Sequence, residues 1–420
     1  MKDLRGRIRL AVIDDNPHVS WEGRTYPVDA TFGRFLSAVL EVDAAIGSID
    51  HCVPLRPAVA PPKTEPTDTR LRIVGTAPFD GIAGYLRHAP TLIRENRRIL
   101  APVVAAADLV VIKVPASNAP IAGWLSIRSR TPRLGYVAGS ALAVARARRL
   151  GLPAQIVGIA YDLAGRLAGG RERIVVGEDI VDGHGVVTSL VDESEIREPV
   201  GGPWPAIPWR LRLAWAGRLA PGKGLDVLID AVASLVSEDA PTQVELVILG
   251  DGPARAGLDA HAGRKGIADR IRWMGHVSDR SVYLDALAAC DLFVFPSPAE
   301  GFPKVILDAM AVGLPVVATP AGSLGGLAAA GLIQPTGSRP DAVAAAVRAL
   351  AGDARAALRL RTSGTAFAAR HTRRAEAGRL VERWRDGFPS LPWTDRGVLE
   401  EQHDRAPSSP TPREIDTGQR

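Results

Sequence analysis

Two carboxylates, Glu300 and Asp308, stand eight residues apart in segment 293–320 of this 420-residue chain. Eight helical steps span about 12 Å at 1.5 Å per residue, comparable to the reach from a hexose across a diphosphate to a ribose. One acid would hold sugar hydroxyls and the other the ribose. Free N–H groups at a helix start between them would face the diphosphate, because the helix dipole favours negative charge there. The spacing predicts a nucleotide-sugar site, although the two acids alone equally fit a solvated loop and a surface helix.

Local composition places these acids on a strand, a loop and a helix. Residues 292–295 are apolar and suit a buried strand, 296–303 are rich in turn residues, and 304–312 have helical composition. A second strand is predicted at 316–319. The acids therefore bracket the start of a helix that follows a strand.

Two cations are predicted at a second strand end. Strand 211–215 runs into a turn at Gly217, which precedes Arg218 and Lys223, and an amphipathic helix begins near residue 225. Open α/β sheets bind ligands at the carboxyl ends of their strands. A guanidinium and an ammonium there can neutralise a departing diphosphate.

Two more strands return the chain to the same edge. The segment "QVELVILGDGP" predicts a strand that ends in a turn at 250–253, and "RIRWMGHV" predicts one that ends at Gly275. All of these strand ends are expected to meet at one side of a parallel sheet.

These motifs, taken in order, resemble a known family. Gly217-Arg218 with Lys223-Gly224, then "GDGP", "GHV", "EGFPKVILDAMA" and "GLPVVAT" look like the retaining glycosyltransferases of family 4. The resemblance is close over residues 210–350 and weak before residue 200. It implies an α/β protein of the GT-B fold, in which two Rossmann-like doubly wound parallel-sheet domains face each other across a cleft.

The resemblance also implies roles for individual residues. Arg218 and Lys223, after the turn at Gly217, would bind the donor diphosphate, Glu300 would contact the transferred sugar, and Asp308 would hold the ribose. The backbone segments expected to line the donor are Gly301, Phe302 and Pro303 beside the phosphates and sugar, and Gly275, His276 and Val277 beside the base. The family usually has Glu at position 308, so the shorter Asp predicts a closer helix or a weaker ribose contact.

The implied reaction moves a sugar from a nucleoside-diphosphate sugar to an acceptor hydroxyl with retention of configuration. The acceptor would attack the face from which the diphosphate leaves, and a donor phosphate oxygen would take its proton. This implied reaction needs no DxD-like metal site, so we expect no divalent metal and no other cofactor.

Proline and glycine mark a break at 197–210, which we interpret as an interdomain linker. We expect an acceptor-side domain at 1–200, a nucleotide-sugar domain at 201–370, a helix at 371–387 crossing back to the first domain, and a disordered tail at 388–420. The strands predicted in the first domain are 9–13, 72–75, 109–113, 134–137, 155–159, 173–176 and 185–188.

The sequence contains fewer signals for the acceptor site in the first domain. Turn residues around Gly23 precede a helix from about Ala30, which suits an acceptor loop at 21–27, although ordinary loop packing explains Trp21 and Tyr26 equally well. This loop and segment 108–126 faintly resemble transferases that build surface polysaccharides. We therefore expect a saccharide or lipid-linked acceptor.

Histidines and cysteines give no strong chemical signal. Many relatives carry a rim histidine that touches the sugar, but after strand 134–137 this chain has Ala138-Gly139. His18 and His88 are rim candidates that also fit surface or capping roles, and His184 and His276 lack metal-site spacing. Cys52 and Cys290 are expected to be reduced thiols.

Composition and charge limit the kinds of partner that the chain is expected to bind. The chain is 46% hydrophobic with a net charge of +5, and it begins without a signal-peptide pattern, so we expect a cytoplasmic protein. Residues 81–171 hold thirteen Arg and Lys against three Asp and Glu, with arginines clustered at 94–98 and 146–149. Such helices fit peripheral contact with anionic lipid or simply a solvated face. Nucleic-acid binding is disfavoured, because no aromatic residues interleave with the cations.

Three other functions stay open. A nucleotide-sugar epimerase shares the fold, and a non-catalytic nucleotide-sugar-binding protein is consistent with Asp308 and the missing histidine. A dinucleotide-dependent oxidoreductase fits less well, because the first strand's turn "DDNPHVS" lacks the glycine fingerprint.

Overall fold

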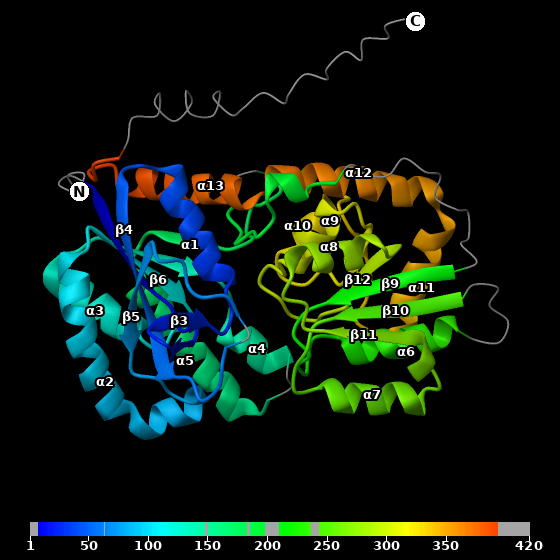
Figure 1. The fold of residues 1–420 in the computed structure, drawn as a ribbon, viewed down its shortest axis with the longest axis horizontal. Helices are drawn as coiled ribbons and strands as arrows, with labels where there is room; N and C mark the ends of the chain where they lie inside the picture. The colour runs from blue at the N-terminus through cyan, green and yellow to red at the C-terminus, as the bar shows by residue number, and fades with distance from the viewer. Residues whose placement is uncertain are drawn as a thin grey trace, which may run out of the picture.

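A computed structural model of the chain describes residues 7–62, 64–147, 150–182, 185–197, 210–236 and 243–393. Figure 1 shows two α/β units side by side, with α12 (Ala354–Arg370) and α13 (Arg373–Gly387) running along one edge of both. We call β1–β8 with α1–α5 and α13 the N-terminal unit, and β9–β14 with α6–α12 the C-terminal unit. The bounds of their elements follow.

In the N-terminal unit, the described strands form one sheet in the order β3-β2-β4-β1-β6-β7-β8, with β5 also pairing β4. Its strands are β1 (Ile8–Ile13), β2 (His18–Trp21), β3 (Arg24–Pro27), β4 (Ile46–Pro57), β5 (Leu71–Thr76), β6 (Leu109–Val114), β7 (Arg133–Val137) and β8 (Arg173–Val175). All pairs are parallel except the β2–β3 hairpin. Parallel strands buried on both faces carry continuous apolar runs, as "IRLAVI" and "LVVIKV" do here.

Helices cover both faces of this sheet. They are α1 (Thr31–Val42), α2 (Gly81–Ala106), α3 (Ala119–Ser129), α4 (Ala141–Ala147) and α5 (Leu152–Ala168). One hydrophobic cluster joins α1 and α13 to the sheet, and a second joins α2 and α3 to its other face. Trp384 of α13 is fully buried in the first cluster, and the Arg385 guanidinium lies 3.0 Å from the Asp43 carboxylate at the end of α1.

In the C-terminal unit, the described strands form one parallel sheet in the order β11-β10-β9-β12-β13-β14. Its strands are β9 (Arg210–Ala216), β10 (Gln243–Leu249), β11 (Ile271–Gly275), β12 (Leu292–Phe295), β13 (Val316–Ala318) and β14 (Gln334–Pro335). Its remaining helices are α6 (Leu225–Leu235), α7 (Arg255–Arg264), α8 (Arg280–Ala288), α9 (Val305–Ala311), α10 (Leu324–Ala329) and α11 (Pro340–Gly352). Trp215, Phe293 and Phe295 stack between these layers with ring centroids 6.2 Å apart in each neighbouring pair.

The doubly wound α/β architecture predicted from the sequence is confirmed, with one wrong strand. Residues 155–159 lie inside α5, where Pro153 occupies the first helical turn. Glycines explain how a helix fits there: a Cβ at Gly165 would lie 2.3 Å from Val114 Cγ1, and one at Gly169 would lie 2.6 Å from Gly135 Cα. The β-branched residues that predicted a strand instead lie mostly on the outer face of this helix.

Other differences are smaller. The predicted strand 185–188 forms a single bridge between Val186 and Val176, and β4 and the two hairpin strands were not among the predicted strands. Most of the proposed linker, 198–209, and the tail from 394 lie outside the described residues. Phe388, Leu391 and Trp393, which we assigned to the tail, pack against the N-terminal core.

Residues 310–334 carry no charged side chain, and they are divided among the end of α9, β13, α10 and the start of β14. In the part of the chain that the structure describes, no helix has the length and apolar character needed to cross a bilayer.

Candidate active site

Three glycine turns hold the carboxyl edge of the C-terminal sheet together. The Gly217 N–H donates to the Leu249 carbonyl at 2.9 Å, and the Gly250 N–H donates to the Gly275 carbonyl at 2.7 Å. A Cβ at Gly250 would lie 1.9 Å from the Gly217 carbonyl oxygen, so no larger residue fits there. The strand ends after β9, β10 and β11 therefore form one continuous rim, as the sequence predicts.

Lys223 and Glu300 meet on this rim. The Lys223 ammonium donates to Glu300 Oε1 at 2.7 Å and to Oε2 at 3.0 Å, and the Ser297 hydroxyl donates to Oε1 at 2.7 Å. The Glu300 side chain is 11% exposed and that of Lys223 is 36% exposed. The two predicted residues thus form a half-buried ion pair that still reaches solvent.

A close backbone contact positions this pair. Gly224, at the start of α6, has a φ of +73°, and a Cβ there would lie 2.2 Å from the Pro296 carbonyl oxygen. The loop after β9 is therefore pressed onto the loop after β12. Only glycine combines this left-handed conformation with such an approach.

Arg218 is exposed in the segment that joins the end of β9 to Lys223. Within the described ranges, its guanidinium makes no hydrogen bond or ion pair. A cation that is not already paired retains its full capacity to bind an anion.

Asp308 differs from Glu300 in its environment. It is 4% exposed, and both of its oxygens are engaged: Arg280 donates to Oδ1 at 2.8 Å and the Tyr283 hydroxyl donates to Oδ2 at 3.2 Å. Burial, and then the Asp308 charge, raise the pKa of Tyr283 well above its usual value, so this tyrosine stays a donor.

Arg280 connects Asp308 to the segment between the two units. Its Nε and Nη2 each lie 2.9 Å from an oxygen of Glu195, in the short helix η1 (Glu193–Glu195), while Nη2 also binds Asp308. Burial opposes the charge on Arg280, but the two carboxylates outweigh it and raise its pKa. Sequence reasoning missed Arg280, Tyr283 and Glu195; the one available signal was Asp279, whose side chain caps α8 at this rim.

Two of the remaining predicted donor residues, Gly301 and Phe302, lie at the interface of the two units. A Cβ at Gly301 would lie 2.7 Å from the Ala138 carbonyl oxygen, and a Cβ at Gly177 would lie 3.0 Å from Phe302 Cβ. The Phe302 side chain is buried in the C-terminal core, so only its backbone could face a ligand. Ala138-Gly139, where the family resemblance led us to look for a rim histidine, thus lies directly against the Glu300 loop.

Lys304, which follows Pro303, faces the N-terminal unit. Burial lowers the pKa of this lysine, and Asp29, just before α1, counteracts that effect. In turn, Lys304 helps to hold the pKa of Asp29 below its usual value against the effect of burial. The helix start predicted to face the donor phosphates thus also presents an additional cation.

On the N-terminal rim, a buried polar cluster lies at the ends of β1 and β6. The Lys113 ammonium lies 2.8 Å from Asp14 Oδ1 and 4.3 Å from the Phe32 ring centroid, and His51 lies 3.4 Å from Asp14 Oδ2. Burial raises the pKa of Asp14, but Lys113 and His51 outweigh it and hold the pKa well below its usual range. This aspartate is therefore a fixed anion.

The histidine candidates do not converge. His18 is buried in this cluster, where its Nδ1 lies 3.0 Å from the Asn16 carbonyl, while His88 and His276 are exposed. His184 lies outside the described residues. Gly23 forms the tip of the β2–β3 hairpin with a φ of +74°, and the turn by itself explains this glycine. Trp21 and Tyr26 belong to the same hairpin.

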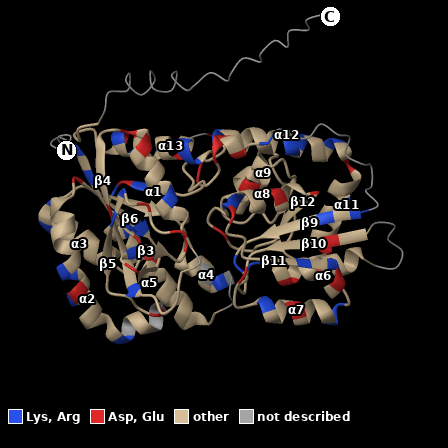
Figure 2. Cartoon of the chain, viewed as in Figure 1, with Lys and Arg blue, Asp and Glu red and all other residues tan. Residues whose placement is uncertain are grey.

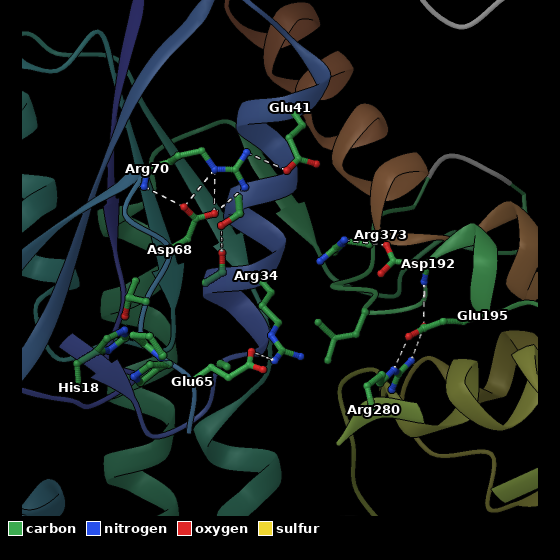
Figure 3. Close-up of a pocket in the computed structure, with 17 residues that line it drawn as sticks. His18, Arg34, Glu41, Glu65, Asp68, Arg70, Asp192, Glu195, Arg280 and Arg373 are labelled. Carbon is green, nitrogen blue, oxygen red and sulfur yellow. Dashed lines mark hydrogen bonds and ion pairs between the residues drawn. The ribbon is translucent and has the colours of Figure 1, made fainter. Parts of the chain in front are cut away.

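A polar pocket of about 480 Å³ lies beside the rim, between α1, segment 65–70 and segment 190–195. Figure 3 shows two walls of charged pairs: Arg34–Glu65 and Arg70–Asp68 on one, and Arg280–Glu195 and Arg373–Asp192 on the other. Arg280 therefore contacts Asp308 and also lines this pocket. The pocket includes none of the donor residues predicted from the sequence.

No group of three or more His, Cys, Asp and Glu side chains within the described ranges is arranged to hold a metal ion. Metal independence stays a prediction. Cys52 and Cys290 are both free thiols in buried positions.

Part of the C-terminal unit matches a known protein family. Residues 210–353 match the profile of the family described as "Glycosyl transferases group 1". A GDP-mannose-dependent alpha-(1-6)-phosphatidylinositol dimannoside mannosyltransferase of Mycobacterium tuberculosis is 36% identical over 145 residues, which are 34% of this chain and 36% of that protein. The chain therefore matches little more than a third of the length of this curated relative.

Solved structures extend the similarity to almost the whole fold. Sucrose-phosphate synthase from Thermosynechococcus elongatus superposes with a TM-score of 0.64 at 18% identity, covering 91% of this chain and all of that one. Alr3699/HepE of Anabaena, solved in complex with UDP, gives a TM-score of 0.59 at 18% identity, with 91% and 100% coverage. At this level of identity the likeness concerns the fold, which is GT-B.

Proposed function

Because residues 210–353 form a group 1 glycosyltransferase domain within a GT-B fold, we propose that this protein is a retaining glycosyltransferase. It transfers a sugar from a nucleoside-diphosphate sugar to an acceptor hydroxyl. The donor class, the retention of configuration and the acceptor class are all parts of this proposal.

One observation carries the proposal. Lys223 and Glu300 come from loops that are 77 residues apart, yet they form an ion pair at the carboxyl edge of the sheet. Arg218 is exposed in the loop that also carries Lys223, and α9 begins five residues after Glu300. Two cations and a helix N-terminus suit a diphosphate, and a carboxylate that accepts hydrogen bonds suits sugar hydroxyls.

The positions of these residues suggest how the sugar is transferred. As the bond between the sugar C1 and the diphosphate oxygen breaks, its electron pair stays on that oxygen. Arg218, Lys223 and the first turn of α9 stabilise this growing charge more in the transition state than in the ground state. The acceptor oxygen then bonds to C1 on the same face, and its proton passes to a donor phosphate oxygen. Glu300 orients the sugar through its hydroxyls.

Asp308 is proposed as the ribose ligand, although both of its oxygens already accept hydrogen bonds. A ribose hydroxyl can add to Asp308 if Arg280 gives up the hydrogen bond to Oδ1 and keeps its two bonds to Glu195. The base lies along Gly275, His276 and Val277. The names of the compared proteins support either GDP or UDP as the nucleotide.

The acceptor is proposed to be a saccharide or a lipid-linked saccharide used in cell-surface polysaccharide or glycolipid synthesis. The pocket in Figure 3 supports a hydroxyl-rich ligand, because its four arginines are each paired with an acid. Such walls offer many hydrogen-bonding groups without a large net charge.

Thermal-shift screening against UDP-, GDP- and ADP-sugars tests the donor class. We expect one nucleotide to raise the melting temperature of the wild type and to have little effect on Lys223→Ala and Glu300→Ala. Lys265→Ala is the matched control, because this lysine is paired with Asp230 and lies outside the rim. Equal stabilisation of all four proteins, or of none, would contradict the site.

Product analysis separates the proposed transfer from the other functions of the same fold. The enzyme should release a nucleoside diphosphate only when an acceptor saccharide is present, and NMR of the product should show the anomeric configuration of the donor. Epimerised donor without acceptor would indicate an epimerase. Donor binding without turnover over a broad acceptor panel would indicate a binding protein.

A further inference from the structure

Helix α5 exposes an apolar face that no described residue covers. Its outer side chains recur at helical spacing and are between 50% and 74% exposed: Leu152, Ile156, Ile159, Leu163 and Leu167. At 100° per residue they fall within an arc of about 80°. We call these five residues the α5 stripe.

The α5 stripe is not a misplaced core face. The opposite side of the helix is the buried one, and there Gly158, Gly165 and Ala168 approach α4, β6 and α3 closely. Small residues face the protein and large apolar residues face outward, which reverses the usual amphipathic pattern of a surface helix. An exposed apolar face of this length indicates an interaction surface.

Neighbouring helices extend the surface. α3 packs against α5 and exposes Trp124 and Ile127, and α2 packs against α3 and exposes Ile93. The three helices lie on the same side of the N-terminal sheet, away from α1 and α13. The exposed apolar residues therefore belong to one helical layer.

Cations surround the apolar residues. Arg97 and Arg128 both lie over the Trp124 ring, at 5.4 Å and 6.0 Å from its centroid. Figure 2 shows basic residues distributed over α2 and α3, whereas α5 has one acid and one cation, Asp162 and Arg166. The exposed arginines of this layer and its margins include Arg87, Arg94, Arg97, Arg98, Arg128, Arg130, Arg146, Arg166 and Arg171.

We propose that the α5 stripe, with Trp124 and the surrounding arginines, docks the protein on an anionic membrane surface. Leu and Ile side chains enter the headgroup boundary, Trp sits at the interface, and arginines bind lipid phosphates. The proposal does not depend on the transferase activity.

Two other occupants fit the observations less well. A two-fold contact between copies would bring the same arginines of both copies together, and like charges repel across an interface. The segment 394–420 contains Val398 and Leu399 but little else that is apolar, so it offers too few side chains to cover a five-residue stripe.

Co-sedimentation with vesicles tests the proposal. The full-length wild type should bind phosphatidylcholine vesicles containing phosphatidylglycerol, bind pure phosphatidylcholine weakly, and lose part of the binding at high salt. The variant Leu152→Ser/Leu163→Ser/Leu167→Ser should lose more than about tenfold in vesicle affinity. Val282→Ser/Leu358→Ser, at positions about half exposed in the C-terminal unit, is the control and should bind like the wild type.

Further measurements distinguish a loss of membrane binding from misfolding or loss of a dimer. Circular dichroism and donor-induced thermal shifts should be unchanged in the triple-serine variant, because the mutated side chains already face solvent. Arg97→Gln/Arg128→Gln should weaken binding to the anionic vesicles specifically. No retention of the wild type on anionic vesicles would overturn the proposal. So would a wild-type dimer that the serine variant converts to a monomer.

Discussion

The Lys223 ammonium lies 2.7 Å from Glu300 Oε1, so the cation assigned to the diphosphate and the carboxylate assigned to the sugar form one unit. Each holds the other at the rim, and the Ser297 hydroxyl donates a second hydrogen bond to the same carboxylate oxygen. Donor binding would insert phosphate and sugar oxygens beside a pair that is already formed. The two residues should therefore behave as coupled in mutagenesis.

A double-mutant cycle tests this coupling. Lys223→Ala and Glu300→Gln should each lower kcat by roughly 10²- to 10³-fold, since each removes stabilisation from the transition state. The double variant should lose less than the product of the two effects, with a coupling of about 0.5–3 kcal/mol. Steady-state kinetics with saturating acceptor measures all four proteins. Strict additivity would show that the ion pair has no role in transfer.

The shared guanidinium of Arg280 gives a prediction about stability. Arg280→Ala leaves Asp308 and Glu195 without their cation and should lower the free energy of unfolding by about 3–5 kcal/mol. Asp308→Asn should cost less, because Arg280 keeps both bonds to Glu195. Urea denaturation of the two variants checks the order. A larger loss for Asp308→Asn would contradict this account of the network.

Glu195 is predicted to affect donor binding through Arg280. Glu195→Gln removes the competing charge, so Arg280 should bind Asp308 more tightly and compete with the donor ribose. We expect the donor KM to rise roughly fivefold with little change in kcat. Glu193→Gln, in the same short helix but in contact with Thr372, is the control. An unchanged donor KM in Glu195→Gln would indicate that Asp308 does not bind the ribose.

Gly301 is predicted to be required for the approach of the two units. A Cβ at this position would meet the Ala138 carbonyl oxygen at 2.7 Å, and a backbone atom yields less easily than a side chain. Gly301→Ala should therefore lower kcat/KM by at least about tenfold. Gly257→Ala, in α7 with no atom within 4 Å of the new methyl group, should keep full activity and add up to about 1 kcal/mol of stability. Equal activities would show that the interface tolerates a methyl group.

His18 predicts an acid-dependent loss of stability. Burial is the largest cause that lowers its pKa, from 6.5 to about 4, and the neighbouring His51 and Lys113 add to that effect while Asn16 and Asp14 oppose it. Within the described residues its Nε2 has no hydrogen-bond partner. The unfolded chain binds this proton below about pH 6.5 and the folded chain does not. Stability should therefore fall as the pH drops from 6.5 to 4, by roughly 3 kcal/mol from this group.

His18→Asn removes the titrating group and keeps a donor for the Asn16 carbonyl. The wild type should lose more stability than this variant between pH 7 and pH 4.5, whereas the exposed His276→Asn should follow the wild type. Urea midpoints at several pH values provide the measurement. Parallel curves for wild type and His18→Asn would show that His18 is not a buried neutral group.

Local patterns in the sequence determined most of the C-terminal unit. The strand ends at Gly217, Gly250 and Gly275 and the loop at Glu300 each depend on a few consecutive residues, and parallel strands place their carboxyl ends on one edge. The positions of Lys223 and Glu300 on one rim therefore follow from sequence order and fold type. Their contact at 2.7 Å does not, because it also requires the close approach of Gly224 to Pro296.

Tertiary structure alone decided the rest. Arg280, Glu195 and Asp308 are far apart along the chain, and charged residues at surface-like positions carry no sequence signal for their partners. Helix α5 also shows what a short sequence pattern does not determine. Its residues 155–159 are consistent with a buried strand or a helix, since a short apolar run fits both periods. The longer series of apolar residues from Leu152 to Leu167 has helical spacing, and the close approach of α5 to Val114 and Gly135 decided which face of the helix is buried. The large apolar side chains therefore point outward, where a membrane can meet them.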